Sequence, residues 1–164
     1  MRDQHPVDAL CDLLLEEDLQ TSYVALSGDA FSLPKFIAHP LSMVGSDAVL
    51  LGDFPSPRTY GCFPVILGKF ARDEGVLSLP EAIRKMTSFP AQRLGLRRRG
   101  LLRDGFAADV VVFDPRTVSA PATRSQPKQL STGIDYVFVN GSLVIDDGQH
   151  TGVLAGRALR RGRD

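Results

Sequence analysis

The sequence predicts an α/β protein whose first 99 residues alternate helices and strands and whose last third, from Gly100, is a small β module. Two observations lead to this division. In the first part, apolar residues at helical spacing alternate with short strand-like runs, in the order helix, strand, helix, strand that is typical of a parallel sheet with covering helices. After Gly100 the pattern changes to β-branched runs separated by turn residues.

The first helix and the first strand have clear signals. Pro6 suits a first helical turn, and the apolar residues that follow fall at i, i+3, i+4 and i+7: Val7, Leu10, Cys11 and Leu14. We expect an amphipathic helix over residues 6–18. Thr21 to Leu26 (TSYVAL) is β-branched and aromatic, and a Gly-Asp pair follows it, which predicts a strand that ends near Ser27.

A second helix and a second strand lead to the main candidate residue. Ser32 can cap a short helix that runs through Ile37, and Pro40 closes it, because the residue before a proline resists the helical region. Leu41 to Val44 predicts a short buried strand. This strand runs into a Gly-Ser-Asp turn, so Asp47 lies at the mouth of a long loop, where α/β proteins place their chemistry. The competing interpretation is a turn aspartate that bonds its own backbone.

Three further helices are predicted before the β module. Phe63, Ile66, Leu67 and Phe70 lie at helical spacing and predict a helix over residues 63–73. Ser78 and Glu81 have the spacing of a capping box, ahead of a stripe that we expect to be buried: Leu79, Ala82, Ile83 and Met86. Ser88 is expected to cap a short helix that ends at Gly95.

The β module contains three predicted strands. Val110 to Phe113 is a β-branched run between turn residues, and residues 116–133, rich in Pro, Ser, Thr and Gln, predict an exposed loop. Two more strands are predicted on either side of Asn140-Gly141, the strongest hairpin signal in the chain. So few strands have little apolar area, so we expect this module to dock on something or to be completed by other strands.

Composition excludes several classes of protein. The formal net charge is zero, and the basic residues are scattered except for Arg97 to Arg99 and the C-terminus, which argues against nucleic acid or an anionic membrane as the main partner. The two cysteines, Cys11 and Cys62, form no disulfide or zinc pattern, so a reducing cytoplasm is expected. The N-terminal apolar run is interrupted by acidic residues and is neither a signal peptide nor a membrane span.

Three stretches together resemble the C-terminal part of the D-aminoacylases, the N-acyl-D-amino-acid deacylases of the metal-dependent amidohydrolase superfamily. They are HPLSMVGSDA, then PSPRTYGCFPVILGKFARDEGVLSLPEAIRKMTSFPAQRLGLRRRGLLRDGFAADVVVFDP, then IDYVFVNGSLVIDDGQHTGVLAGRALR. The resemblance implies that residues 1–99 are the last two β/α units of a (β/α)8 barrel. It also implies that residues 100–164 are the C-terminal part of a small β-sandwich domain.

The resemblance also implies a reaction and a site. Asp47 matches the family's catalytic aspartate, which would take a proton from a zinc-bound water and pass it to the leaving amide nitrogen of an N-acyl-D-amino acid. Ser46, Arg58 and Tyr60 are candidates for a loop that shapes the substrate pocket. For Arg58 and Tyr60 the alternative is a loop anchored to the barrel rim, and for Ser46 it is a turn residue.

No metal ligand is expected within this chain. Zinc needs about three protein ligands, and the three histidines, His5, His39 and His150, include no His-x-His pair. The resemblance places the ligands in earlier strands, so we expect a C-terminal piece of an amidohydrolase, a hydrolase of linear amides, that is inactive alone. Two alternatives remain: one subunit of a split enzyme, in which a separate chain carries the rest of the barrel, and a non-catalytic interaction module.

Overall fold

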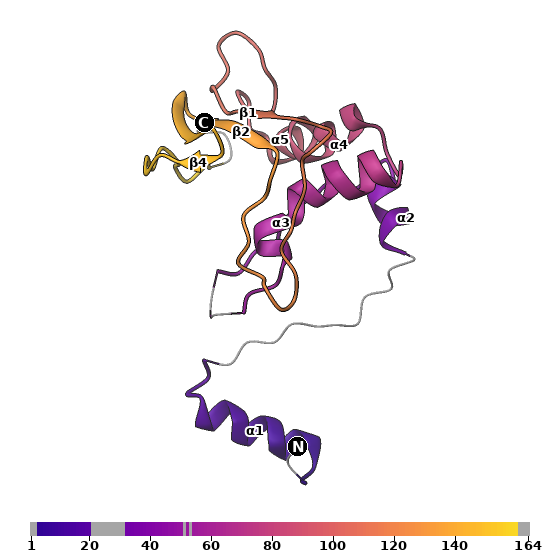
Figure 1. Cartoon of the computed structure of the whole chain (residues 1–164), viewed down its shortest axis with the longest axis vertical. Helices are drawn as coiled ribbons and strands as arrows, with labels where there is room; N and C mark the ends of the chain where they lie inside the picture. Colours follow the sequence, from indigo (N-terminus) through magenta and orange to yellow (C-terminus); the bar gives the residue numbers. More distant parts are fainter. Residues whose placement is uncertain (1–2, 21–31, 51, 53, 161–164) are drawn as a thin grey trace.

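The computed structural model describes residues 3–20, 32–50, 52 and 54–160. Its body consists of helices packed beside a small antiparallel sheet, and helix α1 lies below that body (Figure 1). The fold is thus a mixture of helix and sheet, as predicted. Within the described residues, no helix has the length and apolar character needed to cross a membrane.

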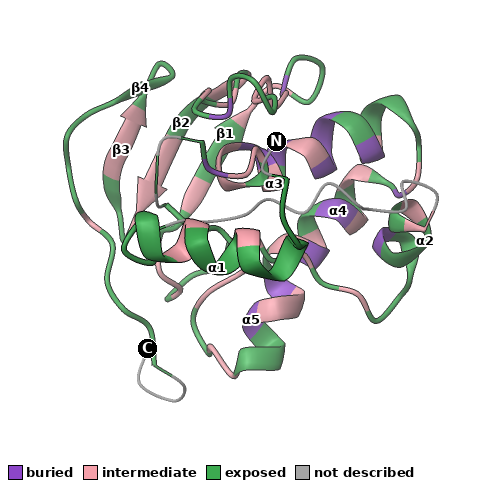
Figure 2. Ribbon diagram, turned by 90° about the horizontal axis from the view of Figure 1, so that it is seen from below, coloured by how far each residue is buried: buried purple, intermediate pink, exposed green. Residues whose placement is uncertain are grey.

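Helix α1 (Pro6–Glu16) forms where the sequence predicts it, with His5 as its N-cap and proline in its first turn. Its apolar stripe, however, is not buried: Val7 is 58% exposed and Leu10 is 54% exposed. Figure 2 shows this helix in the colours of exposed and half-buried residues. The amphipathic pattern therefore predicted the helix correctly, but the apolar face has no cover among the described residues.

Helix α2 (Leu33–Ala38) ends as the proline rule predicts. His39 leaves the helical region with φ −61° and ψ 133°, because Pro40 follows it. Ser32 is the N-cap position, but its side chain makes no capping hydrogen bond. The strand predicted at residues 21–26 lies outside the described residues.

The strand predicted at Leu41–Val44 is wrong, since residues 42–50 have no regular secondary structure. The Val44 N–H donates to the carbonyl of Lys85, in helix α4, and so pairs with a helix and not with a strand. A parallel strand needs a neighbour on each side to form its hydrogen bonds. None of the four described strands neighbours this segment, so the segment stays extended but irregular.

Helix α3 (Arg58–Val65) continues directly into the π-helix η1 (Ile66–Asp73). The sequence predicted a single helix from residue 63, so the helical segment begins five residues early, and Arg58 and Tyr60 lie in its first turn and not in a loop. Pro64 removes one helical N–H donor inside α3, and the Tyr60 carbonyl, four residues earlier, accepts from Ser131 Oγ at 3.0 Å. The π-helix η1 ends at Asp73, and Gly75, two residues later, has a positive φ of 61°.

Helices α4 (Leu79–Met86) and α5 (Ser88–Leu94) also form where the sequence predicts helices. Ser78 caps α4 by accepting from the Glu81 N–H at 3.4 Å, although the Glu81 carboxylate binds Arg84 and does not complete the capping box. Gly95 ends α5 in the left-handed conformation with φ 73°. Ser88 is the first residue of α5, and Thr87 occupies the N-cap position.

The sheet is an antiparallel meander in the order β1-β2-β3-β4. Its strands are β1 (Val110–Phe113), β2 (Ile134–Val139), β3 (Ser142–Asp146) and β4 (Gln149–His150). Asn140 and Gly141 have φ of 50° and 83°, the left-handed pair that a tight two-residue hairpin requires. The sequence missed β4, which a second such pair, Asp147-Gly148, turns back onto β3.

The core lies where η1 and α4 meet the loop between β1 and β2. Figure 2 shows the buried residues gathered on these helices. Val118, in the loop predicted to be exposed, is fully buried. We call its packing against the helices the seam: Val118 lies over Gly68, whose added Cβ would meet the Val118 carbonyl at 2.6 Å, and Ala120 lies over Gly61 at the same distance.

Candidate active site

Asp47 lies on an exposed, irregular segment between α2 and α3. Its backbone is left-handed, with φ 46°, and its side chain is 82% exposed. One partner holds it: the Arg58 guanidinium donates to Oδ2 at 2.7 Å. We call residues 45–47 together with Arg58 the rim.

The first turn of α3 positions the rim from one side. Arg58 is the first residue of that helix, and its side chain is 53% exposed. The Cys62 thiol, one turn further along, lies 3.7 Å from the Gly45 carbonyl and can donate to it. Thr59 Oγ1 approaches the Val49 carbonyl at 3.5 Å. Helix α3 therefore holds the segment on both sides of Asp47.

Burial beneath this segment raises the pKa of the Cys62 thiol, and the positive charge of Arg58 opposes part of that rise. The thiol therefore stays protonated at neutral pH and serves as a weak hydrogen-bond donor. This environment does not suit a nucleophile, which would need a lowered pKa.

Helix α4 fixes the other end of the same segment through Lys85. This lysine is 1% exposed, and its Nζ donates to the carbonyls of His39 and Ser42 and to Ser42 Oγ, the last at 2.9 Å. The Lys85 carbonyl also accepts from the Val44 N–H. Three donor positions of the ammonium group are thus used to tie down the chain just before the rim.

Sequence reasoning missed Lys85, although a signal for it existed. The position lies three residues after Ala82 and six after Leu79, on the stripe that faces the core. A lysine is usually read as exposed. The stripe predicted as buried also included Ile83, which is exposed in the structure.

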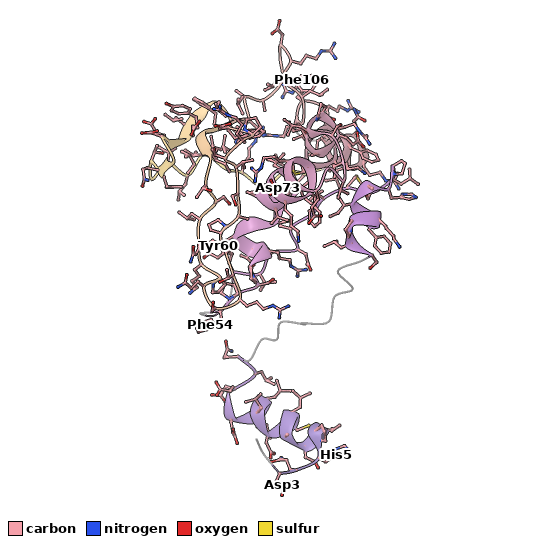
Figure 3. The ribbon with its side chains drawn as sticks, turned by 45° about the vertical axis from the view of Figure 1, so that its right-hand side comes forward. Asp3, His5, Phe54, Tyr60, Asp73 and Phe106 are labelled. Carbon is pink, nitrogen blue, oxygen red and sulfur yellow. The ribbon has the colours of Figure 1, made fainter. Side chains whose placement is uncertain are left out.

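Ser46 and Tyr60 are the two other residues that the sequence singled out for this site. Ser46 is half-buried beside Asp47. Tyr60 is half-buried on α3, and its backbone carbonyl accepts from Ser131 Oγ at 3.0 Å. Figure 3 shows Tyr60 on the side of the body that also carries Phe54. Tyr60 thus joins α3 to the loop between β1 and β2, which supports its anchoring role.

The residues of this chain do not fit a metal. Among the described positions, no three His, Cys, Asp or Glu side chains lie together as possible ligands. Each histidine instead uses Nδ1 to accept from the backbone N–H two residues ahead: His5 from Val7, His39 from Leu41 and His150 from Gly152. The histidines therefore stabilise local turns.

The geometry gives the rim a limited chemistry. An exposed carboxylate beside a guanidinium can exchange protons with water and can bind a polar group. It has no enclosing walls among the described residues, so it cannot exclude water or orient a substrate by itself.

Comparisons with known proteins extend over nearly the whole chain. The family model for the amidohydrolase family matches residues 3–145. A D-aminoacylase of Alcaligenes xylosoxydans xylosoxydans is 43% identical over 133 residues, which are 81% of this chain and 28% of that enzyme. An N-acyl-D-aspartate deacylase of the same organism is 40% identical over 151 residues, 88% of this chain and 30% of that enzyme. The chain thus spans less than a third of these relatives.

Solved structures agree with the sequence comparisons. A crystal structure of D-aminoacylase superposes with a TM-score of 0.79 at 41% identity, covering 81% of this chain and 28% of the other. An N-acyl-D-glutamate deacylase from Bordetella bronchiseptica, crystallised with zinc and a phosphonate inhibitor, superposes with a TM-score of 0.70 at 39% identity, covering 78% of this chain and 28% of the other.

Proposed function

Because this chain belongs to the amidohydrolase family, we propose that it supplies the catalytic carboxylate, Asp47, to a zinc-dependent deacylase of N-acyl-D-amino acids. The observation that carries this proposal is the continuous similarity to three deacylases, which are 40 to 43% identical over at least 81% of the chain. The names of all three relatives specify D-amino acid derivatives or D-aminoacylase activity.

Asp47 has the properties that amide hydrolysis requires. In that reaction a water oxygen bonds to the acyl carbon, the C–N bond breaks, and the amine leaves with an added proton. A carboxylate can accept the proton from the water and donate it to the nitrogen without bonding to the substrate. Arg58 donates to Asp47 Oδ2 at 2.7 Å and so orients the carboxylate.

The rest of the site must come from polypeptide beyond these residues. We propose that residues 1–99 form the last two β/α units of a (β/α)8 barrel and that residues 100–164 form part of a small β-sandwich domain. In such a barrel Leu41–Val44 would gain the neighbours that a strand needs. The metal ligands and the walls of the pocket would then lie on the preceding strands. The described residues contain no group of three possible metal ligands, so we assign them no step through a metal.

The first experiment tests the 164-residue chain alone. The pure protein, dialysed against zinc, is assayed for release of the free amino acid from N-acetyl-D-amino acids. We expect no turnover, because the described residues contain no metal site. Turnover that survives removal of trace enzymes would overturn the assignment of the metal ligands to another part of the protein.

The second experiment supplies the missing part. The chain is co-expressed with the polypeptide encoded immediately upstream, and the assay is repeated on the purified complex. We expect activity that Asp47→Asn abolishes and that Asp104→Asn, a change at an exposed turn aspartate of the β module, leaves largely intact. An active complex that keeps full activity with Asp47→Asn would show that Asp47 is not the catalytic acid or base.

A non-catalytic interaction module is the competing function, and the exposure of Asp47 is the observation that favours it. That function predicts that Asp47→Asn changes nothing measurable. It also predicts that changes at the Asn140-Gly141 turn, which shapes the β2–β3 hairpin, weaken binding to a partner. A pull-down of the upstream polypeptide with both variants separates the two functions.

A further inference from the structure

A second candidate site lies in the β module, away from the rim. A hollow of about 190 Å³ opens where the chain after α5, the turn before β1 and the C-terminal segment meet. Its lining consists of Arg98, Arg99, Gly105, Phe106, Ala107 and Arg157. Figure 3 shows Phe106 at the opposite end of the body from Phe54 and Tyr60.

Among the described residues, the lining includes three arginines and no acidic residue. The three arginines come from segments that are far apart in sequence, so the fold itself brings these charges together. Like charges that gather in one hollow repel each other unless an anion lies between them. Elsewhere in the chain, Arg72, Arg84 and Arg116 each form an ion pair with a nearby carboxylate.

Arg99 forms the fixed floor of the hollow. Its side chain is only 9% exposed, and its two terminal nitrogens bind the Asp109 carboxylate and Asn140 Oδ1. Its Nε is buried and has no hydrogen-bond partner among the described residues. A buried donor without a partner is rare and calls for an explanation. Arg99 lines the hollow, and no described protein group fills the hydrogen-bonding capacity of its Nε.

Arg98 and Arg157 form the open sides. Both are exposed, and neither forms an ion pair with a carboxylate of the described residues. The Arg98 carbonyl accepts from the Ala107 N–H, which fixes the Arg98 backbone beside the turn. Since Asp109 already neutralises Arg99, two positive charges remain uncompensated at the hollow.

We propose that this hollow binds a small dianionic oxyanion, namely a phosphate group, between Arg98 and Arg157. The planar fork of arginine matches phosphate oxygens in pairs. The volume corresponds to about six water molecules at ~30 Å³ each, which admits a phosphate group with few further atoms. The bound group would join the end of the helical part to the C-terminal segment that carries Arg157.

Titration of the full chain with inorganic phosphate tests this proposal. The ¹⁵N–¹H spectrum is followed at constant ionic strength, with sodium chloride replaced stepwise by sodium phosphate at pH 7.5. We expect saturable shifts at the Arg98, Arg99 and Arg157 Nε–H signals and at the amides of residues 105–107. Shifts that grow linearly without saturation, or that spread evenly over all exposed arginines, would overturn the proposal.

Charge-neutralising variants locate the site. Arg98→Gln and Arg157→Gln should each weaken phosphate binding about tenfold, and the double variant should abolish saturation. Arg124→Gln removes one positive charge from an exposed loop outside the lining and should leave the affinity unchanged. Equal weakening by all three single variants would show a general charge effect and contradict a built site.

A last arm distinguishes the kind of anion. Acetate, titrated in the same way, should bind at least tenfold more weakly than phosphate. Acetate carries one charge, and it lacks the third oxygen with which phosphate can bridge two guanidinium groups. Tighter binding of acetate would assign the hollow to a carboxylate, such as an acidic side chain of another polypeptide segment, and would refute the phosphate site. Both glutamine variants change exposed side chains, and their circular dichroism spectra confirm that they fold.

Discussion

The seam and the rim are both built on the helical segment α3–η1, yet they differ sharply in burial. At the seam, Val118 is fully buried and two glycines of the helix accept the loop at distances that leave no room for a methyl group. At the rim, the carboxylate of Asp47 is 82% exposed and has one side-chain partner.

This difference separates stability from chemistry within the chain. The described contacts of the seam join a buried loop to a glycine-bearing helix. The rim has a positioned carboxylate and a tethered backbone but no cover. Changes at the seam should therefore alter the free energy of unfolding, whereas changes at the rim should alter the proposed deacylase activity and have little effect on stability.

Gly133→Ala should cause the largest loss in the free energy of unfolding. Gly133 has φ 72°, and an added Cβ would lie 2.5 Å from the Val118 nitrogen, a rigid backbone atom. Left-handed strain and overpacking together should lower the free energy of unfolding by about 3–4 kcal/mol. Gly75→Ala is the matched control, because Gly75 has φ 61° but open space around it, and it should lose only about 1–2 kcal/mol. Urea unfolding measures both, and equal losses would show that the close approach is not costly.

Lys85→Met should cause the second-largest loss in the free energy of unfolding, and it tests the link between the core and the rim. The change keeps the length of the side chain but removes the Lys85 hydrogen bonds to both carbonyls. The His39 carbonyl keeps the Ser42 N–H and hydroxyl as donors, whereas the Ser42 carbonyl loses the buried ammonium, at a cost of about 1–3 kcal/mol. Alkylation of Cys62, which contacts Gly45, should become faster because the segment before the rim loosens. Lys69→Met, at an exposed lysine of η1, is the control and should change neither quantity. Unchanged Cys62 reactivity in Lys85→Met would show that the lysine does not hold the rim.

Acid should weaken the seam to a smaller degree. Arg72 donates to the Val118 carbonyl and, through its hydrogen bond to Asp73, lowers the pKa of that carboxyl below its ordinary value of 3.8. Arg116 likewise lowers the pKa of Asp114. Because the folded pKa values are depressed, the stabilisation is fully present above about pH 4 and is lost as the pH falls through the folded pKa values. Unfolding midpoints measured from pH 6 to pH 3 should fall, and Asp73→Asn and Asp114→Asn should each flatten that fall. A slope that persists in both variants would assign the acid sensitivity to other groups.

Asp47→Asn should have the smallest effect on stability, no more than about 0.5 kcal/mol, because exposed ion pairs contribute little. The measurement is urea unfolding of the isolated chain. Arg58→Gln, which removes the same ion pair from its other side, is the companion variant and should behave alike. A loss of about 2 kcal/mol or more in either variant would contradict the separation of the two regions.

Local signals in the sequence predicted the elements that depend on local physics. The strand Val110–Phe113 and the Asn140-Gly141 turn form at the predicted residues, since β-branched runs and left-handed pairs act within a few positions. Helices α1, α4 and α5 follow their apolar periods and caps. Asp47 and Arg58 were both singled out, and the structure brings them together across 11 positions.

The features that the sequence did not predict depend on distant neighbours. Leu41–Val44 has the composition of a strand, but a strand forms only beside partners. Val118 lies in a polar stretch and is buried because a glycine of the helix, Gly68, leaves space for its backbone. Lys85 is buried because its ammonium group finds carbonyl acceptors 43 and 46 positions away. Composition cannot reveal such distant acceptors.

The π-helical geometry of η1 makes the length of this segment critical. Removal of one residue between Ile66 and Asp73 would rotate everything that follows relative to everything before it, by roughly a quarter of a turn. Lys85 would then face away from His39 and Ser42, and Gly68 would no longer lie opposite Val118. Relatives with single-residue gaps in this stretch should therefore carry compensating changes at the positions of Lys85, His39 and Ser42 and in the loop between β1 and β2.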